Sequence, residues 1–208
     1  MAAHHYSTFP VTNRGFTLIE ILIAMAITAT SLVFVTYFTV DISNFGTDLS
    51  NRLSAEFELQ LTLRAMISEI RSMGPGGNGA YPIATATTTT FTFYSDIDGD
   101  GAFEQVRYFL DGTILKKGVT DPTATEPVLY PPANEVISEV VHYMIPGTVF
   151  TYYPEGLPDE MSPLASPVDV SKVRLVKITG VVDKDTTLPP LSTTLSLTVT
   201  IRNLRGEI

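Results

Sequence analysis

Cysteine and tryptophan are absent from the 208 residues, and basic side chains are few. Without cysteine the chain can form neither a disulfide framework nor a thiolate metal site, so an extracytoplasmic domain would depend on packing, assembly or a hard cation. The 13 Lys and Arg stand against 22 Asp and Glu, which gives a net charge of −9. This balance argues against nucleic-acid contact, because neutralising phosphates requires clustered basic residues.

The residues of common catalytic centres are also scarce. The histidines are His4, His5 and His142, and the sequence has no serine-nucleophile motif, phosphate-binding glycine loop or histidine cluster. Asp159 and Glu160 lie in a predicted loop with no evident partner. His142 lies far from the other two histidines in the sequence, and an isolated histidine is more often a packed or surface residue than a catalyst. The sequence therefore predicts a protein that is not an enzyme.

One long apolar stretch stands out against this acidic background. Residues 16–40 contain a single charged residue, Glu20. At about 1.5 Å per helical residue they reach roughly 37 Å, enough to cross a hydrocarbon core of about 30 Å. Arg14 precedes the stretch and acidic sequence follows it, so the positive-inside rule predicts a cytoplasmic N-terminus and an external head. We expect residues 16–40 to be a single transmembrane helix.

A cleaved secretory signal is the alternative interpretation of this stretch. Ala24-Met25-Ala26 matches the small-x-small pattern of a signal cleavage site. However, the apolar run continues for 14 residues past Ala26, Glu20 interrupts it, and residues 1–15 carry a single positive charge. These features disfavour a signal peptide, which has a basic start and a short apolar core.

The segment RGFTLIE, residues 14–20, closely resembles the processing site of type IV prepilins and type II secretion prepseudopilins. The resemblance is sharp over about residues 14–26 and extends further only as a layout, an apolar helix followed by a β-rich head. It implies that a prepilin peptidase cuts between Gly15 and Phe16 and methylates the new amine of Phe16. Residues 1–15 would then be a leader peptide.

Within this resemblance Glu20 has a physical explanation. Cleavage would create an ammonium on Phe16, four residues earlier and on the same helix face. An unpaired carboxylate in lipid is costly, and intramembrane acids usually have a partner. Pairing with the amine of a neighbouring subunit would set the axial register, and such a heterologous contact builds a filament when it does not close into a ring. Tip subunits of the family characteristically lack this acid, which implies a position below the tip.

Beyond residue 40 the pattern becomes amphipathic. Apolar residues recur at spacings of three and four, so residues 41–73 are predicted to form a helix that packs on the head. The run GPGGNG at 74–79 ends it, because proline and glycine do not continue a helix. The apolar positions are Ile42, Phe45, Leu49, Leu53, Phe57, Leu59, Leu63, Met66, Ile67 and Ile70.

The head, residues 74–208, shows the two-residue period of β-strands. Strands are predicted around 91–94, 105–110, 136–145, 149–153, 172–182 and 194–202, with a hairpin turn at Asp111-Gly112 and proline-rich loops at 122–132, 154–167 and 188–191. The fold class is therefore α+β: a long N-terminal helix, transmembrane in its first half and amphipathic in its second, packed on a mostly antiparallel β-sheet head.

An acidic loop lies between two of these predicted strands. Positions 1, 3, 5 and 6 of an EF-hand-type calcium loop are matched by Asp96, Asp98, Asp100 and Gly101. The match fails at position 12, which is Arg107, so Glu104 would have to complete a different kind of site. The candidate Ca²⁺ ligands are therefore Asp96, Asp98, Asp100 and Glu104. An ordinary Asp/Gly hairpin turn explains the same residues on backbone grounds alone.

Together these features predict a structural subunit, a minor pilin or minor pseudopilin. The segments 98–110, DGDGAFEQVRYFL, and 197–205, LTVTIRNLR, also resemble PilW-like minor pilins and J-type pseudopilins. The resemblance implies a prepilin peptidase, other pilin subunits, an inner-membrane assembly platform and membrane lipid as partners. The expected location is the bacterial inner membrane, followed by a periplasmic pseudopilus or an extracellular pilus. A major pilin, or an anchored or secreted calcium-binding β domain with no filament role, are the alternatives.

Overall fold

The computed structural model of the chain describes residues 15–154, 162–183 and 192–201. The leader before Gly15, the pair Asp159 and Glu160, the loop 188–191 and the part of segment 197–205 that follows Ile201 lie outside the described residues. The chain divides into two units, Met1–Leu49 and Ser50–Ile208, and each is described by itself.

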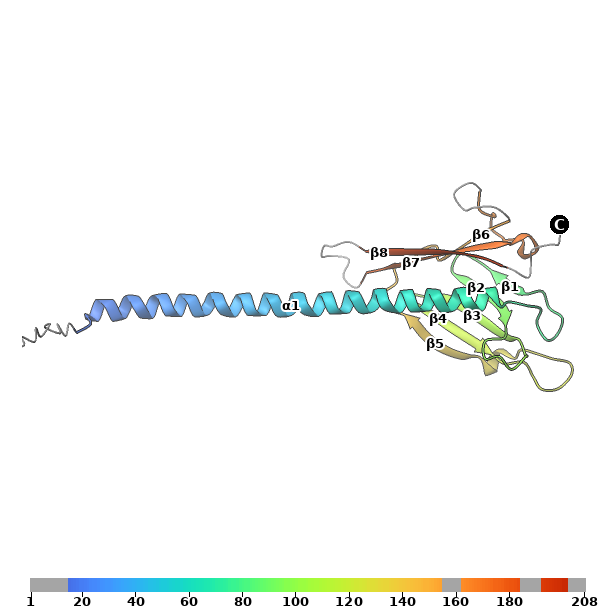
Figure 1. Ribbon diagram of the computed structural model, residues 1–208, viewed down its shortest axis with the longest axis horizontal. Coiled ribbons are helices and arrows are strands. Elements are labelled where there is room, and N and C mark those ends of the chain that lie inside the picture. Colours follow the sequence, from blue (N-terminus) through green and yellow to red (C-terminus); the bar gives the residue numbers. More distant parts are fainter. Residues whose placement is uncertain (1–14, 155–161, 184–191, 202–208) are drawn as a thin grey trace, which may run out of the picture. The chain divides into compact units, whose positions relative to one another are not determined.

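A single helix, α1 (Leu18–Arg71, 54 residues), forms the first element of the chain (Figure 1). Its part Leu18–Thr47 is 30 residues long, has a mean hydropathy of 2.3 and is unburied, so by length and composition it could cross a membrane. The threonine hydroxyls of this part form hydrogen bonds with backbone carbonyls of the same helix. Those of Thr30, Thr36 and Thr39 donate to the carbonyls four residues earlier at 2.6–2.8 Å. The threonines therefore add little polar surface to this apolar segment.

The second unit contains two antiparallel sheets (Figure 1). The larger has the order β1 (Ile83–Ala86), β2 (Thr90–Ser95), β3 (Glu104–Asp111), β4 (Ile114–Thr120) and β5 (Val136–Val141). The smaller has the order β6 (Phe150–Tyr153), β7 (Leu175–Val182) and β8 (Thr193–Thr200), and two short 3-10 helices are η1 (Pro132–Asn134) and η2 (Val170–Lys172). Sequential antiparallel pairing of these strands, with the long apolar helix before them, confirms the predicted α+β class.

The core of this unit forms where the C-terminal part of α1 meets both sheets. Leu59, Leu63, Met66 and Ile70 of α1 are at most 1% exposed, which is the burial that their spacing predicts. On the side of the smaller sheet β7 approaches closely, because a Cβ added at Gly180 would lie 2.5 Å from Leu59 Cδ1. Aromatic rings join the sheets to each other: the Phe91 ring of β2 lies 5.8 Å from that of Phe150 in β6.

On the side of the larger sheet, α1 is held by an ion pair. Lys117 Nζ on β4 lies 2.6 Å from Glu69 Oε1, and the Tyr108 hydroxyl on β3 donates to Glu69 Oε2 at 2.8 Å. The side chains of Lys117 and Glu69 are 17% and 14% exposed, so the pair is largely removed from water. Burial raises the pKa of Tyr108, and the charge and hydrogen bond of Glu69 raise this pKa further. Tyr108 therefore remains a hydrogen-bond donor at neutral pH.

Two strand boundaries differ from the sequence expectation. The predicted strand 136–145 ends at Val141, because Tyr143 takes a left-handed φ of 60° and the chain turns toward the smaller sheet. There the Ile145 amide donates to the Val181 carbonyl at 2.8 Å. The predicted strand 172–182 begins with η2 and becomes β7 only at Leu175.

Candidate functional site

The processing motif lies at the start of α1. Gly15, Phe16 and Thr17 precede the helix, and Phe16 is 80% exposed. An added Cβ at Gly15 would meet nothing within 4 Å. The bond between Gly15 and Phe16 is thus outside regular structure and accessible, which is how proteolytic sites are usually presented.

Thr17 and Glu20 form a capping box around the first turn of α1. The Glu20 amide donates to Thr17 Oγ1 at 3.3 Å, and the Thr17 amide donates to Glu20 Oε2 at 3.4 Å. The reciprocal bonds satisfy two amides that a helix N-terminus otherwise leaves without partners. The sequence signal is T-x-x-E immediately before an apolar run, and reasoning from charge alone missed it. Glu20 therefore has a donor in its own chain before any neighbouring subunit is present.

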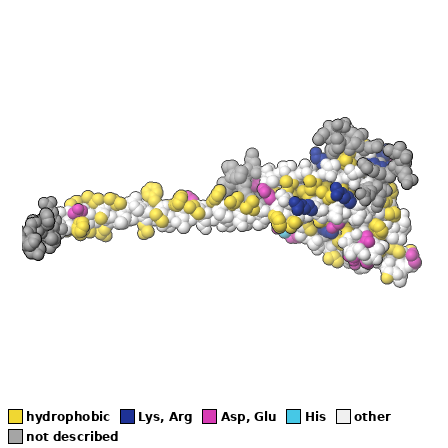
Figure 2. Space-filling view, in the orientation of Figure 1, with side chains coloured by type: hydrophobic (Ala, Val, Ile, Leu, Met, Phe, Trp, Pro, Cys, Tyr) yellow, Lys and Arg dark blue, Asp and Glu magenta, His cyan; other side chains and the backbone are white. Residues whose placement is uncertain are grey.

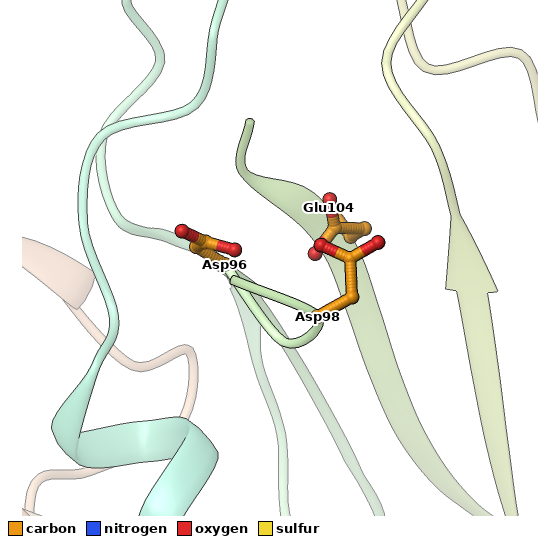
Figure 3. A group of neighbouring side chains, drawn as sticks. All are labelled: Asp96, Asp98 and Glu104. Atoms are coloured by element: carbon orange, nitrogen blue, oxygen red, sulfur yellow. The ribbon is translucent and has the colours of Figure 1, made fainter. Parts of the chain in front are cut away.

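The acidic loop joins β2 to β3, as its position between two predicted strands suggested. Carboxylate oxygens of Asp96, Asp98 and Glu104 lie within 4.8 Å of one another (Figure 3). Asp96 follows β2, Asp98 lies in the exposed turn, and Glu104 is buried at the first position of β3. Three convergent carboxylates could hold a metal ion, because hard cations prefer oxygen ligands.

Asp100, the fourth candidate ligand, does not belong to this group. Its Oδ1 accepts a hydrogen bond of 2.7 Å from the Ala102 amide. Asp96 also serves the loop backbone: its two oxygens accept from the amides of Gly99 and Gly101 at 2.7 and 3.1 Å. Both glycines have positive φ, 81° and 90°, so the tight turn requires them. The hairpin-turn interpretation thus accounts for Asp96 and Asp100 without an ion.

Glu104 is the buried member of the carboxylate group. Burial raises the pKa of its carboxyl above the ordinary value, and the charges of Asp98 and Asp100 raise this pKa further. A hydrogen bond from the Ile97 amide to Glu104 Oε2, at 2.9 Å, opposes this rise. A bound cation would stabilise the ionised form in the same way as a second donor.

The comparison with known families agrees with the N-terminal geometry. A family described as "Prokaryotic N-terminal methylation motif" matches residues 12–36, which include the processing motif and the first part of α1. No curated protein matches the chain in a sequence comparison. The motif and the apolar helix fit a chain that is anchored in a membrane through its N-terminal segment. Together with the β-rich head they support the type IV pilin and pseudopilin family, whose members are structural subunits.

The motif carries further implications for partners. It implies processing by a prepilin peptidase and assembly with other pilin subunits. The resemblance first drawn from residues 14–20 is thereby confirmed at the level of the family.

Proposed function

We propose that the chain is a minor pilin or minor pseudopilin of a type IV pilus or a type II secretion filament. In this proposal a prepilin peptidase cuts after Gly15 and methylates Phe16, and the mature chain sits in the bacterial inner membrane with its head in the periplasm. An assembly platform then extracts it into the filament. The predicted boundaries are retained: leader 1–15, transmembrane helix 16–40, amphipathic helix 41–73 and head 74–208.

The observation that carries this proposal is an exposed apolar row on α1 beyond the candidate membrane span. Leu53, Phe57 and Leu61 are 57%, 61% and 49% exposed, although Leu59 on the same helix is fully buried. Figure 2 shows hydrophobic side chains exposed along α1. By hydropathy the candidate span reaches Thr47 at the furthest, seven residues beyond the proposed transmembrane helix, so this row belongs to the unit that contains the β-sheets.

Helix packing between subunits would bury this row. Its members are spaced by four residues and therefore lie on one side of the helix. Fully burying a Leu or Phe side chain contributes about 1.5–3 kcal/mol relative to exposure, so three such residues provide a substantial driving force. Contiguous exposed apolar surface on a soluble part of a protein generally marks an interaction site.

Glu20 would set the register of this packing. After cleavage the Phe16 ammonium of a neighbouring subunit can approach the Glu20 carboxylate, which lies in an otherwise uncharged segment. In the precursor the Thr17 amide is the donor, and in the filament the ammonium would replace or join it. A charge-assisted contact is the stronger of the two and exists only at the correct stagger.

The test is filament incorporation of variants in cells that express the chain's own assembly system. Glu20→Gln should keep cleavage but reduce incorporation at least several-fold, because glutamine retains the capping contact and loses the charge. Phe57→Ser should reduce incorporation without lowering the membrane level, while Gln60→Ala, at an exposed polar position of the same helix, serves as the matched control. Normal incorporation of both Glu20→Gln and Phe57→Ser would contradict the proposal. The subunit's stoichiometry in isolated filaments separates a minor from a major pilin.

For the acidic loop we propose Ca²⁺ as the ion that Asp96, Asp98 and Glu104 hold. The support is the convergence of three carboxylates around a turn. Calcium should raise the melting temperature of the full-length protein in detergent relative to chelator, and Asp98→Asn should reduce that increase. Asp121→Asn, outside the carboxylate group, is the control. An equal melting temperature in calcium and chelator would leave the hairpin-turn interpretation.

A further inference from the structure

His142 occupies the segment that leads from the larger sheet to the smaller one. It follows β5 directly and precedes Tyr143, whose left-handed φ redirects the chain. The next residue, Met144, donates its amide to the Thr113 carbonyl at 2.8 Å and is buried. The His142 side chain is 41% exposed, so water and protons reach it.

Both ring nitrogens of His142 lie beside carboxylates from different elements. Nδ1 is 3.1 Å from Glu58 Oε2 on α1, and Nε2 is 3.2 Å from Glu139 Oε2 on β5. The His142 backbone amide also donates to Glu58 Oε2 at 3.4 Å. One turn further along α1, the Thr62 hydroxyl donates to the Val140 carbonyl at 3.0 Å. The end of β5 is thus attached to the helix by these contacts.

The two ring contacts cannot both be hydrogen bonds when the imidazole is neutral. A neutral imidazole has one N–H donor, whereas the imidazolium has two, and ionised carboxylates only accept. We infer that Glu58, His142 and Glu139 form a pH-sensitive clamp: the protonated ring donates to both carboxylates and so joins the end of β5 to α1, whereas the neutral ring donates to only one of them. This inference goes beyond the proposed function, because it concerns the head and its helix by themselves.

Other charged and titratable groups surround the clamp. Lys116 Nζ on β4 lies 3.8 Å from Glu139 Oε1, but its closer partner is Asp111 at 2.8 Å. The ring of Tyr143 is centred 6.3 Å from that of His142, and the Asp183 amide donates to the Tyr143 carbonyl. Lys116 competes with His142 for Glu139, whereas among the described residues the Glu58 carboxylate contacts His142 alone.

The sign of the pH effect follows from the charges. Hydrogen bonding to Glu58, then to Glu139, raises the pKa of His142 above its ordinary value. The stabilisation is therefore complete below the ordinary histidine pKa of about 6.5 and is lost as pH rises through the higher folded-state pKa. β5 is an edge strand of its sheet, and its Val136 and Ile137 are more than half exposed. Loss of the clamp would loosen this edge, which other chains can pair with.

The clamp is tested by NMR titration of the histidine ring signals in the full-length protein in detergent micelles. His142→Gln identifies the signal and separates it from those of His4 and His5. The measured pKa of His142 should lie above the ordinary value, fall in Glu58→Gln and in Glu139→Gln, and stay unchanged in Asp169→Asn, whose carboxylate contacts Ser171 and Lys172 instead. An ordinary pKa in the parent chain, or one that neither substitution lowers, would overturn the clamp.

A second measurement separates a pH-dependent clamp from a fixed structural contact. Hydrogen-exchange protection of the β5 amides, corrected for intrinsic exchange, should fall several-fold as pH rises through the His142 titration. In His142→Gln this fall should disappear. Protection that changes equally with pH in both chains would also overturn the inference.

Discussion

The packing of α1 on the smaller sheet predicts a large energetic coupling between Leu59 and Gly180. Leu59→Ala removes a fully buried side chain and should lower the free energy of unfolding by about 2–5 kcal/mol. Gly180→Ala places a methyl group 2.5 Å from Leu59 Cδ1 and 3.0 Å from Cδ2, so the Leu59 side chain, or the helix or strand that carries the two residues, must shift. Such overpacking costs about 1–3 kcal/mol.

Backbone strain does not explain that cost. Gly180 is not among the glycines with positive φ, so alanine fits its backbone. In the absence of the clash, Gly→Ala at a compatible site would stabilise by about 0.4–1 kcal/mol. In the double variant the Leu59 methyl groups are gone, and the Gly180→Ala cost should vanish. The predicted coupling energy is therefore about 1–3 kcal/mol in favour of the double variant.

The assay is equilibrium denaturation of the full-length protein in detergent, followed by circular dichroism and by the fluorescence of its nine tyrosines. Phe57→Ala is the matched control, because Phe57 lies two residues from Leu59 but is 61% exposed. Its effect should stay within about 0.5 kcal/mol. Additive single effects, or a Gly180→Ala chain as stable as the parent, would refute the close approach of β7 to α1.

Two further stability predictions follow from the same packing. Glu69→Leu leaves the largely buried Lys117 ammonium and the Tyr108 hydroxyl without their acceptor. It should therefore lower the free energy of unfolding by about 2–4 kcal/mol, and the double variant Glu69→Leu/Lys117→Met should recover part of this loss. No recovery would mean that the ion pair with Lys117 is not how Glu69 stabilises the fold. Gly112→Ala in the β3–β4 turn, where φ is 61°, should cost about 1 kcal/mol, while Gly147→Ala, at an open site without positive φ, should be neutral or stabilising; equal melting shifts would contradict the turn geometry.

The helix was predictable from periodicity, but the extent of its buried face was not. The spacing that correctly predicts burial of Leu59, Leu63 and Ile70 also includes Leu53 and Phe57, which are exposed. Apolar character indicates that a side chain will be buried somewhere. It does not say whether the partner is the chain's own sheet or another subunit, because both contacts select the same residue types.

Strand β4 shows a second limit of pattern reasoning. Its Lys116-Lys117 pair interrupts the apolar alternation that marks a half-buried strand, so the sequence indicated this strand only through the hairpin turn that precedes it at Asp111-Gly112. Lys117 nevertheless faces the helix, because Glu69 supplies a counter-charge 48 residues earlier. Pairings over such distances depend on the tertiary fold, which local periodicity does not contain.

At the candidate metal site, the sequence identified the carboxylate residues of the loop but not the direction in which each side chain points. The acidic loop was expected between two strands and lies there, and the hairpin brings Glu104 to Asp96 and Asp98. Asp100 points to its own backbone instead. Alternate spacing alone cannot distinguish an aspartate that faces an ion from one that closes a turn. The Thr17–Glu20 capping box was not predicted, although its T-x-x-E spacing signals it.

The most direct test of the proposed function is mass spectrometry of the intact protein and its N-terminal peptide, after extraction from the native membrane. The expected result is a mature chain that begins with N-methylated Phe16. A chain that begins near Ile27, or an uncut chain that begins with Met1 while a functional prepilin peptidase is present, would contradict it.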